Sequence, residues 1–212
     1  MKKTTILAFA LLASALGKAD IWDPEVYQVG KLYPGYVIKK SGDTLEGFVK
    51  ALTYYGDENS NQSVCYYYKS EDQSEPTLIY KPPTLQGYKI GDKIYKTIPK
   101  AGLLKSSTLT FVLLEEEGAI STYGYYWYEN CKNTSDPNCK TGIKKNTHFY
   151  NVDWERSVDM QSLTFGFKKK FPELIKDHPE MAEKVAKKEK GYKFFNIYAL
   201  IEEYNKFKAE GN

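Results

Sequence analysis

The feature that most constrains the fold is a change in the period of the hydrophobic residues near Leu163. Before this point, short runs of β-forming residues are separated by turn-forming pairs such as Gly42-Asp43 and Gly91-Asp92. After it, apolar residues recur three and four positions apart, as on one face of a helix. Strands followed by helices predict an α+β fold. We therefore expect a mainly antiparallel β region over residues 20–162, built as a sandwich or small barrel, and a C-terminal helical segment over 163–212 packed on its sheet.

The β region divides into a hairpin around Gly42-Asp43 and a series of short strand candidates. These candidates cover residues 63–69, 77–81, 85–90, 93–98 and 107–114, an aromatic strand from Gly118, and residues 145–154. Residues 57–63 are polar throughout, which predicts a surface loop between strands. The spacing of Asp57, Asn59 and Asn61 resembles a calcium loop, but Gln62 stands where that motif requires glycine, so we do not expect calcium there.

Three helical stretches are expected in the C-terminal segment. The first places Phe167, Phe171, Leu174 and Ile175 on one face. Asp177 can cap the second helix, with Glu180 in the capping-box position, and Gly191 ends it. Asn196 can cap the last helix, whose apolar stripe consists of Ile197, Leu200, Ile201, Tyr204 and Phe207. The lysines between these stripes are interpreted as a solvated face.

Residues 1–19 form the three-part pattern of a secretory signal peptide. Lys2 and Lys3 precede an apolar run from Ile6 to Leu12 that is too short to span a bilayer, and small residues follow it. Cleavage after Ala15 or after Ala19 fits the pattern. We therefore expect an exported protein, periplasmic or extracellular, with no transmembrane segment in the mature chain.

The charge of the mature chain argues against a nucleic-acid partner. The 30 basic and 27 acidic residues give the whole sequence a net charge of +3. Residues 1–19 contain three lysines and no acid, so their removal leaves 27 of each kind and a net charge of zero. Binding to nucleic acid requires a sustained basic surface. Arg156 is also the only arginine in the sequence, so bidentate phosphate clamps can scarcely be built.

Three cysteines are an odd number for an exported chain. Cys131 and Cys139 lie close together in the sequence, whereas Cys65 lies in a strand candidate. The simplest assignment is a Cys131–Cys139 disulfide that closes a surface loop, with Cys65 buried as a free thiol. A loop of this size would gain about 2–3 kcal/mol from the cross-link.

The aromatic strand supplies the candidate binding residues. With a period of two, Tyr123, Tyr125 and Trp127 lie on one face. Ile120, Tyr126 and Tyr128 lie on the other. If one face enters the core, the first set presents aromatic rings to a ligand or partner surface. The alternative is that the helices or the sheet cover both faces, since tyrosine is a common strand residue.

No motif for catalysis, metal binding or cofactor binding is recognisable. The sequence contains two histidines and lacks HExxH, paired CxxC, GxSxG and the phosphate-binding GxxxxGK[ST] pattern. We therefore expect no cofactor, no metal site and no catalytic residue, and a non-catalytic binding or interaction module of the cell envelope. Its partner would be an envelope protein or a glycan. The alternative is a secreted hydrolase, acting on glycans through a carboxylate pair drawn from acids such as Glu115, Asp153 and Glu155.

Four segments occur in a characteristic order: GYVIKKSGDTLEGFVK, YKPPTLQGYKIGDKIY, FKKKFPELIKDHPEM and IEEYN. This order resembles a group of uncharacterised exported proteins of Bacteroidota. In that group a strand pair around Gly-Asp-Thr precedes a proline-containing segment, and a short helical tail ends near Tyr-Asn. The resemblance implies export and this architecture over most of the mature chain, and it implies no activity or site residue.

Overall fold

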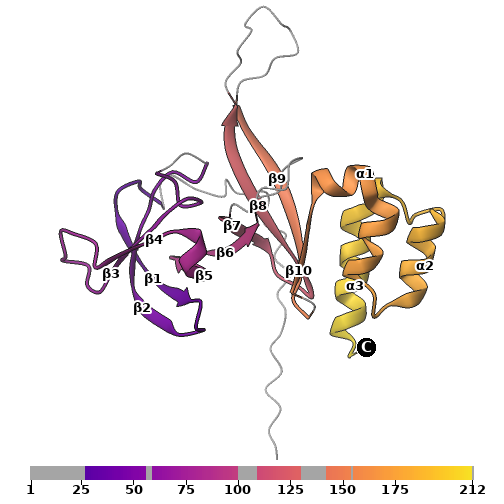
Figure 1. The fold of residues 1–212 in the computed structure, drawn as a ribbon, viewed down its shortest axis with the longest axis horizontal. Helices are drawn as coiled ribbons and strands as arrows, with labels where there is room; N and C mark the ends of the chain where they lie inside the picture. Colours follow the sequence, from indigo (N-terminus) through magenta and orange to yellow (C-terminus); the bar gives the residue numbers. More distant parts are fainter. Residues whose placement is uncertain (1–26, 56–58, 100–108, 130–141, 154, 212) are drawn as a thin grey trace, which may run out of the picture.

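Ten strands form one antiparallel sheet, which makes up the N-terminal two-thirds of the fold (Figure 1). The computed structural model describes residues 27–55, 59–99, 109–129, 142–153 and 155–211. The strands are β1 (Leu32–Lys39), β2 (Thr44–Lys50), β3 (Cys65–Tyr68), β4 (Leu78–Tyr80), β5 (Leu85–Ile90), β6 (Lys93–Pro99), β7 (Leu109–Glu116), β8 (Ile120–Glu129), β9 (Gly142–Asn151) and β10 (Arg156–Asp159). Their order across the sheet is β10-β9-β8-β7-β6-β5-β1-β2-β3-β4.

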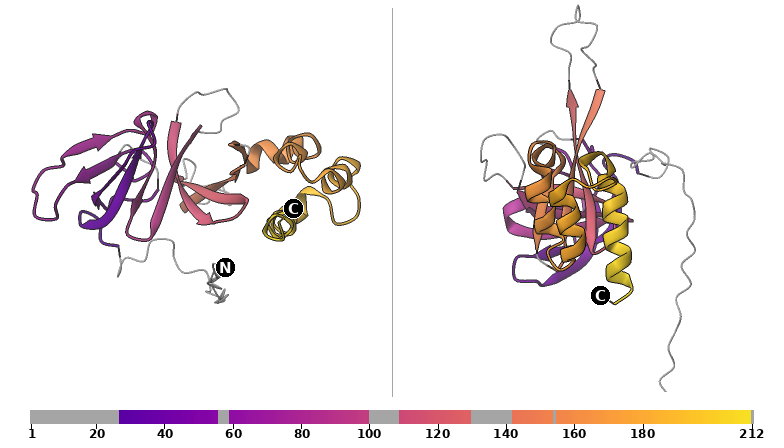
Figure 2. Two further views of the ribbon diagram at one scale, coloured as in Figure 1. Left: turned by 90° about the horizontal axis from the view of Figure 1, so that it is seen from below. Right: turned by 90° about the vertical axis from the view of Figure 1, so that its right-hand side faces the viewer.

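Three helices follow the sheet: α1 (Met160–Lys170), α2 (Pro179–Lys187) and α3 (Ile197–Ala209). Short 3₁₀ turns at Pro82–Thr84, Pro172–Leu174 and Phe194–Asn196 connect elements. The helices gather beyond β10, at the end of the molecule opposite β1–β4 (Figures 1 and 2). The expected α+β class, an antiparallel sheet followed by C-terminal helices, is confirmed.

Most predicted strands have counterparts in the sheet, and one strand was missed. The run 145–154 was expected to be a single strand, but β9 ends at Asn151 and the chain turns back as β10. In this hairpin Asp159 lies opposite His148. The helical region also begins at Met160, earlier than the expected boundary at 163, because the Asp159 carboxylate accepts a hydrogen bond from the Ser162 N–H and caps α1.

The segment between β2 and β3 closes one side of the curled sheet. Its polar residues 57–63 were expected to form a surface loop, yet Ser60, Asn61 and Gln62 are fully buried. The Gln62 carbonyl accepts a hydrogen bond from the Phe111 N–H of β7 at 2.9 Å. The Gln62 side-chain amide pairs with Tyr126 of β8, donating to its carbonyl at 2.6 Å and accepting from its N–H at 2.7 Å. Gln62 thus bridges β7 and β8 where the two strands separate.

Two hydrophobic cores result from this arrangement. The first lies inside the curled sheet and is rich in tyrosine; Tyr88 and Tyr95 stack at its centre with ring centroids 4.7 Å apart. The second joins the helices to Ile120 of β8 and Phe149 of β9. The predicted α3 stripe is confirmed for Ile197, Leu200, Ile201 and Tyr204, which are all buried, whereas Phe207 at its end is half-buried.

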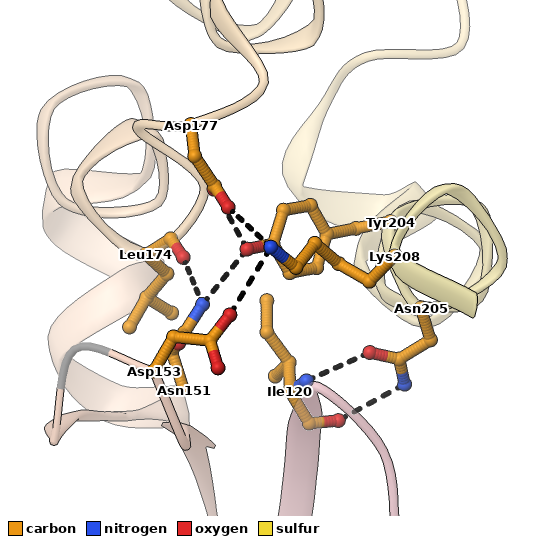
Figure 3. A network of polar contacts seen from close by, with 8 residues as sticks. All are labelled: Ile120, Asn151, Asp153, Leu174, Asp177, Tyr204, Asn205 and Lys208. Atoms are coloured by element: carbon orange, nitrogen blue, oxygen red, sulfur yellow. Dashed lines mark hydrogen bonds and ion pairs between the residues drawn. The ribbon is translucent and has the colours of Figure 1, made fainter. Parts of the chain in front are cut away.

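A polar network fixes the helices to the sheet (Figure 3). Asn205 of α3 accepts a hydrogen bond from the Ile120 N–H at 2.7 Å and donates to the Ile120 carbonyl at 3.0 Å. Asn151 donates to the Leu174 carbonyl and to the Tyr204 hydroxyl. These contacts satisfy backbone groups of the sheet and of the 3₁₀ turn that would otherwise be buried without partners.

Asp177 belongs to this network and does not cap a helix. The prediction that it caps α2 is wrong: His178 is the N-cap residue, and no side-chain capping bond forms. The Asp177 carboxylate instead accepts hydrogen bonds from the Tyr204 hydroxyl at 2.7 Å and from Lys208 Nζ at 2.9 Å. Burial alone would raise the pKa of Asp177, but the bonds from Lys208 and Tyr204 outweigh it and lower that pKa.

Candidate functional site

The predicted aromatic face lies on β8, and the structure brings its three residues onto one side of the sheet. Tyr123 is buried at 7% exposure, with its ring edge-on to Tyr150 of β9. Tyr125 and Trp127 are half-buried and stack on each other with centroids 6.1 Å apart. Burial raises the pKa of Tyr123 to about 12. This face is therefore a partly covered aromatic cluster whose outer part, Tyr125 and Trp127, reaches solvent.

The polar residues next to this cluster make contacts within the fold. Lys96 Nζ lies 3.9 Å from the centroid of the Tyr150 ring, a cation–π contact that holds the ammonium group over the cluster. Tyr123, His148 and Asp159 lie opposite one another on β8, β9 and β10. Burial lowers the pKa of His148 to about 4, although the Asp159 charge opposes the shift, so the imidazole is neutral at pH 7.

Two of the acids considered for a hydrolase, Glu115 and Asp153, are engaged in other contacts. Glu115 accepts a hydrogen bond from the Tyr126 hydroxyl and forms an ion pair with Lys145 at 2.7 Å. Asp153 forms an ion pair with Lys208 at 3.1 Å. Wherever an Asp or Glu pKa departs from its ordinary value in the described residues, the shift is downward. A glycosidase acid needs a raised pKa, which is the opposite direction to these shifts.

The cysteines are described only in part. Cys65 is a free thiol buried in the first core, as expected, and burial raises its pKa. Such a thiol is a poor nucleophile. Cys131 and Cys139 lie outside the described residues, so their disulfide stays a prediction.

A second candidate surface, which the sequence did not point to, lies in the helical segment. It is a cleft of about 480 Å³ between α1 and the segment that leads into α3. We call it the Phe–Lys cleft; its lining comprises Thr164, Phe165, Gly166, Phe167, Lys168, Lys169, Lys188, Lys193, Phe194 and Phe195. Phe165 and Phe195 are 86% and 94% exposed, the highest values among the large hydrophobic residues that the structure describes as exposed.

A row of aromatic rings connects this cleft to the core. Phe195 is edge-on to Phe194 at 5.9 Å, and Phe194 is edge-on to Phe167 at 5.9 Å. Phe167 then stacks on Phe171 at 5.0 Å, and Phe171 is fully buried. The inner rings are therefore fixed by packing, whereas Phe195 at the outer end is almost free of protein contacts. Aromatic pairs of this geometry are favourable beyond the area they bury.

The backbone of α1 helps to shape the cleft. Gly166 departs from helical geometry, with φ −135° and ψ 18°, and kinks the helix between Phe165 and Phe167. Phe167 enters the core while Phe165 points to solvent. The helical pattern of the sequence identified the buried positions, but it gave no reason to expect an exposed phenylalanine two residues away.

The charge of the Phe–Lys cleft is uniformly positive. Lys168, Lys169, Lys188 and Lys193 are exposed in the lining, which contains no acid. None of these four forms an ion pair with any other described residue, whereas Lys184 and Lys187 of α2 each pair with a glutamate four residues earlier at 2.6 Å. The interpretation of the lysines as a merely solvated face therefore fits α2 better than it fits this cleft.

Neither a bilayer-spanning helix nor a metal site is found in the described parts of the chain. No helix within residues 27–211 has the length and hydropathy to cross a membrane. No group of three or more His, Cys, Asp or Glu side chains in those parts is placed to hold a metal ion. Comparisons with protein-family models, with curated proteins and with solved structures found no match for this chain.

Proposed function

We propose that this protein is an exported, non-catalytic binding module of the cell envelope, and that the Phe–Lys cleft is its main binding surface. The observation that carries the proposal is the pair Phe165 and Phe195, two nearly fully exposed rings on the rim of one positively charged cleft. Exposed apolar groups rimmed by charge are typical of interaction surfaces. The partner is a component of the envelope, whether protein, glycan or membrane.

The proposed location rests on the sequence. Residues 1–19 carry the pattern of a secretory signal, and the resemblance to exported proteins of Bacteroidota points to the same compartment. The protein is accordingly proposed to act in the periplasm or outside the cell. The predicted disulfide between Cys131 and Cys139 would require an oxidising compartment of this kind.

The aromatic cluster on β8 is the weaker candidate surface. Tyr123 is already in contact with Tyr150, so only Tyr125 and Trp127 can meet a partner without rearrangement. The secreted hydrolase has less support, because Glu115 is engaged by Tyr126 and Lys145, and Asp153 by Lys208.

Binding to envelope fragments tests the proposal. The chain lacking residues 1–19 keeps every residue that the structure describes and is titrated against washed fragments of the producing cell's envelope. We expect saturable binding that falls at least about tenfold when Phe165 and Phe195 are both changed to serine, because the exposed rings provide the apolar contact. Both rings are exposed, so the double variant should fold normally.

A matched variant locates the surface. Tyr125→Ser/Trp127→Ser removes two aromatic side chains from β8 and leaves the Phe–Lys cleft intact, so it should bind like the unchanged protein. If this variant loses binding and the phenylalanine variant keeps it, the binding surface lies on β8. Turnover of a glycan or peptide substrate in the same fractions would instead support the hydrolase.

A further inference from the structure

The Phe–Lys cleft combines exposed aromatic rings with exposed lysine side chains. Phe165 on α1 and Phe195 in the segment before α3 both line the cleft and are exposed, and the four lysines of the lining are exposed as well. Lys169 also lines a smaller neighbouring cleft, which includes Asp159 and Glu173 and is therefore of mixed charge. Of these two clefts, the one that carries the exposed phenylalanines is the one whose lining is uniformly positive.

An ordinary structural role does not account for all of these lysines. Lys168 and Lys169 lie in the last turn of α1, where cations favour the helix dipole. Lys188 and Lys193 come from the end of α2 and from the segment before α3, and they converge on the same cleft. Four ammonium groups from three segments of the chain, without a carboxylate in the lining, form a site complementary to negative charge.

The exposure of the phenylalanines indicates what kind of partner fits. Residues that dominate protein–protein binding are enriched in packed pockets near the centre of an interface. Phe195, by contrast, touches the protein mainly through its edge-on contact with Phe194, and Phe165 is 86% exposed. Aromatic rings that few protein atoms surround are more easily buried in a fluid lipid phase, which can rearrange around them, than against a rigid protein surface. A bilayer interface accepts such rings while lysine side chains reach the anionic headgroups.

We propose that the Phe–Lys cleft docks the protein on an anionic bilayer surface, with Phe165 and Phe195 inserted at the headgroup boundary and Lys168, Lys169, Lys188 and Lys193 facing the anionic headgroups. The inference rests on the proposed function and specifies its partner. The attachment is peripheral and reversible. It places the helical segment, which carries the cleft, against the membrane; β1–β4 lie at the opposite end of the molecule (Figures 1 and 2).

Vesicle flotation tests this docking. The chain lacking residues 1–19 is mixed with vesicles of phosphatidylcholine alone or of phosphatidylcholine with phosphatidylglycerol. We expect binding to the anionic vesicles only, weakening as salt is added because headgroup attraction is screened. Phe165→Ser/Phe195→Ser and Lys168→Gln/Lys169→Gln should each reduce binding by about tenfold or more.

Control variants test whether binding depends on the lysines of the cleft or only on the total positive charge of the protein. Lys184→Gln/Lys187→Gln removes the same charge from lysines that already pair with glutamates, so it should float like the unchanged protein. Tyr198→Ser removes an exposed aromatic ring that does not line the cleft and should also leave binding unchanged. Circular dichroism confirms that every variant is folded.

The outcomes distinguish the two proposals. Equal binding to neutral and anionic vesicles, no binding to either, or unchanged binding by the cleft variants would overturn the membrane docking. The chain could fail to bind vesicles and still bind delipidated envelope fragments through the same phenylalanines. In that case the partner is a protein or glycan, and only the proposed function stands. If it binds neither, both proposals fail.

Discussion

The side-chain amide of Gln62 forms both of its hydrogen bonds with the main chain of Tyr126, in the manner of a neighbouring strand. The β7–β8 ladder pairs Leu113 with Gly124 and would bring Phe111 opposite Tyr126 if it continued. Gln62 occupies that place, with its carbonyl bonded to Phe111 and its amide to Tyr126. At the other end of β8, the side-chain amide of Asn205 likewise forms two hydrogen bonds with the main chain of Ile120. Two side-chain amides thus complete the pairing of one strand.

Removing the first of these amides should destabilise the sheet. In Gln62→Ala the N–H and carbonyl of Tyr126 lose their partners in a buried position, which costs about 2–5 kcal/mol in total. Urea unfolding followed by circular dichroism measures the loss. Gln86 is exposed and makes one bond of 3.3 Å to the Lys40 carbonyl, so Gln86→Ala should stay within about 0.5 kcal/mol of the unchanged protein. Equal effects for the two variants would contradict the bridging role of Gln62.

Gly118 and Asn205 should be energetically coupled. A Cβ atom at Gly118 would lie 2.3 Å from Asn205 Nδ2, so Gly118→Ala must displace the amide that pairs with Ile120. We expect each single variant to lose about 1–3 kcal/mol. In Asn205→Ala the clash is absent, and the added methyl group should cost at least about 1 kcal/mol less than it does alone. A double-mutant cycle by urea unfolding measures this, and additive effects would rule out the steric coupling.

His148 should make the fold less stable in weak acid. Its folded pKa of about 4 lies below its ordinary value of 6.5 because burial disfavours the imidazolium. The unfolded chain therefore takes up a proton first as the pH falls, so stability is lost between about pH 6.5 and 4. The full effect is about 3 kcal/mol. Urea unfolding at a series of pH values should show this decline in the unchanged protein.

The two histidines provide a matched pair for that measurement. His148→Gln should flatten the decline between pH 6.5 and 4, whatever its effect at pH 7. His178→Gln leaves His148 in place, so the decline should remain. A decline that persists in His148→Gln would mean that other groups produce it.

Thiol labelling checks the cysteine assignment. The native, unreduced chain should take up no label, because Cys65 is buried, its thiol pKa is raised, and Cys131 and Cys139 are predicted to be joined. Unfolding without reductant should expose one thiol, and unfolding with reductant should expose three. Intact mass after alkylation counts the labels. Three labels without reductant would refute the disulfide.

The fold class could be predicted because hydrophobic residues recur with the period of strands in one part of the sequence and with the period of helices in another. The run 85–90 was predicted with the bounds that β5 has, since turn-forming residues flank it. β10 was missed because it is short and its residues, Arg156 to Asp159, do not alternate in hydrophobicity. The buried positions of α3 followed directly from their helical spacing.

The Phe–Lys cleft and the polar contacts of Gln62 and Asp177 could not be predicted, because they depend on contacts between residues that are distant in the sequence. Gln62 is polar and flanked by polar residues, so its burial became visible only once β7 and β8 were in place around it. Phe165 and Phe195 belong to patterns that also contain core residues, and only the packing decides which rings are left outside. Asp177 matched a capping box, but Tyr204 and Lys208, contributed by a helix further along the chain, compete for its carboxylate.

The bond between Asn205 and Ile120 joins residues 85 positions apart, which sets an order of events during synthesis. All ten strands and the first two helices are made before the amide that completes β8 exists. Until then the N–H and carbonyl of Ile120 are open to any other extended chain. A chain halted before residue 205 would therefore be prone to strand pairing with its neighbours, and α3 protects the sheet against that association.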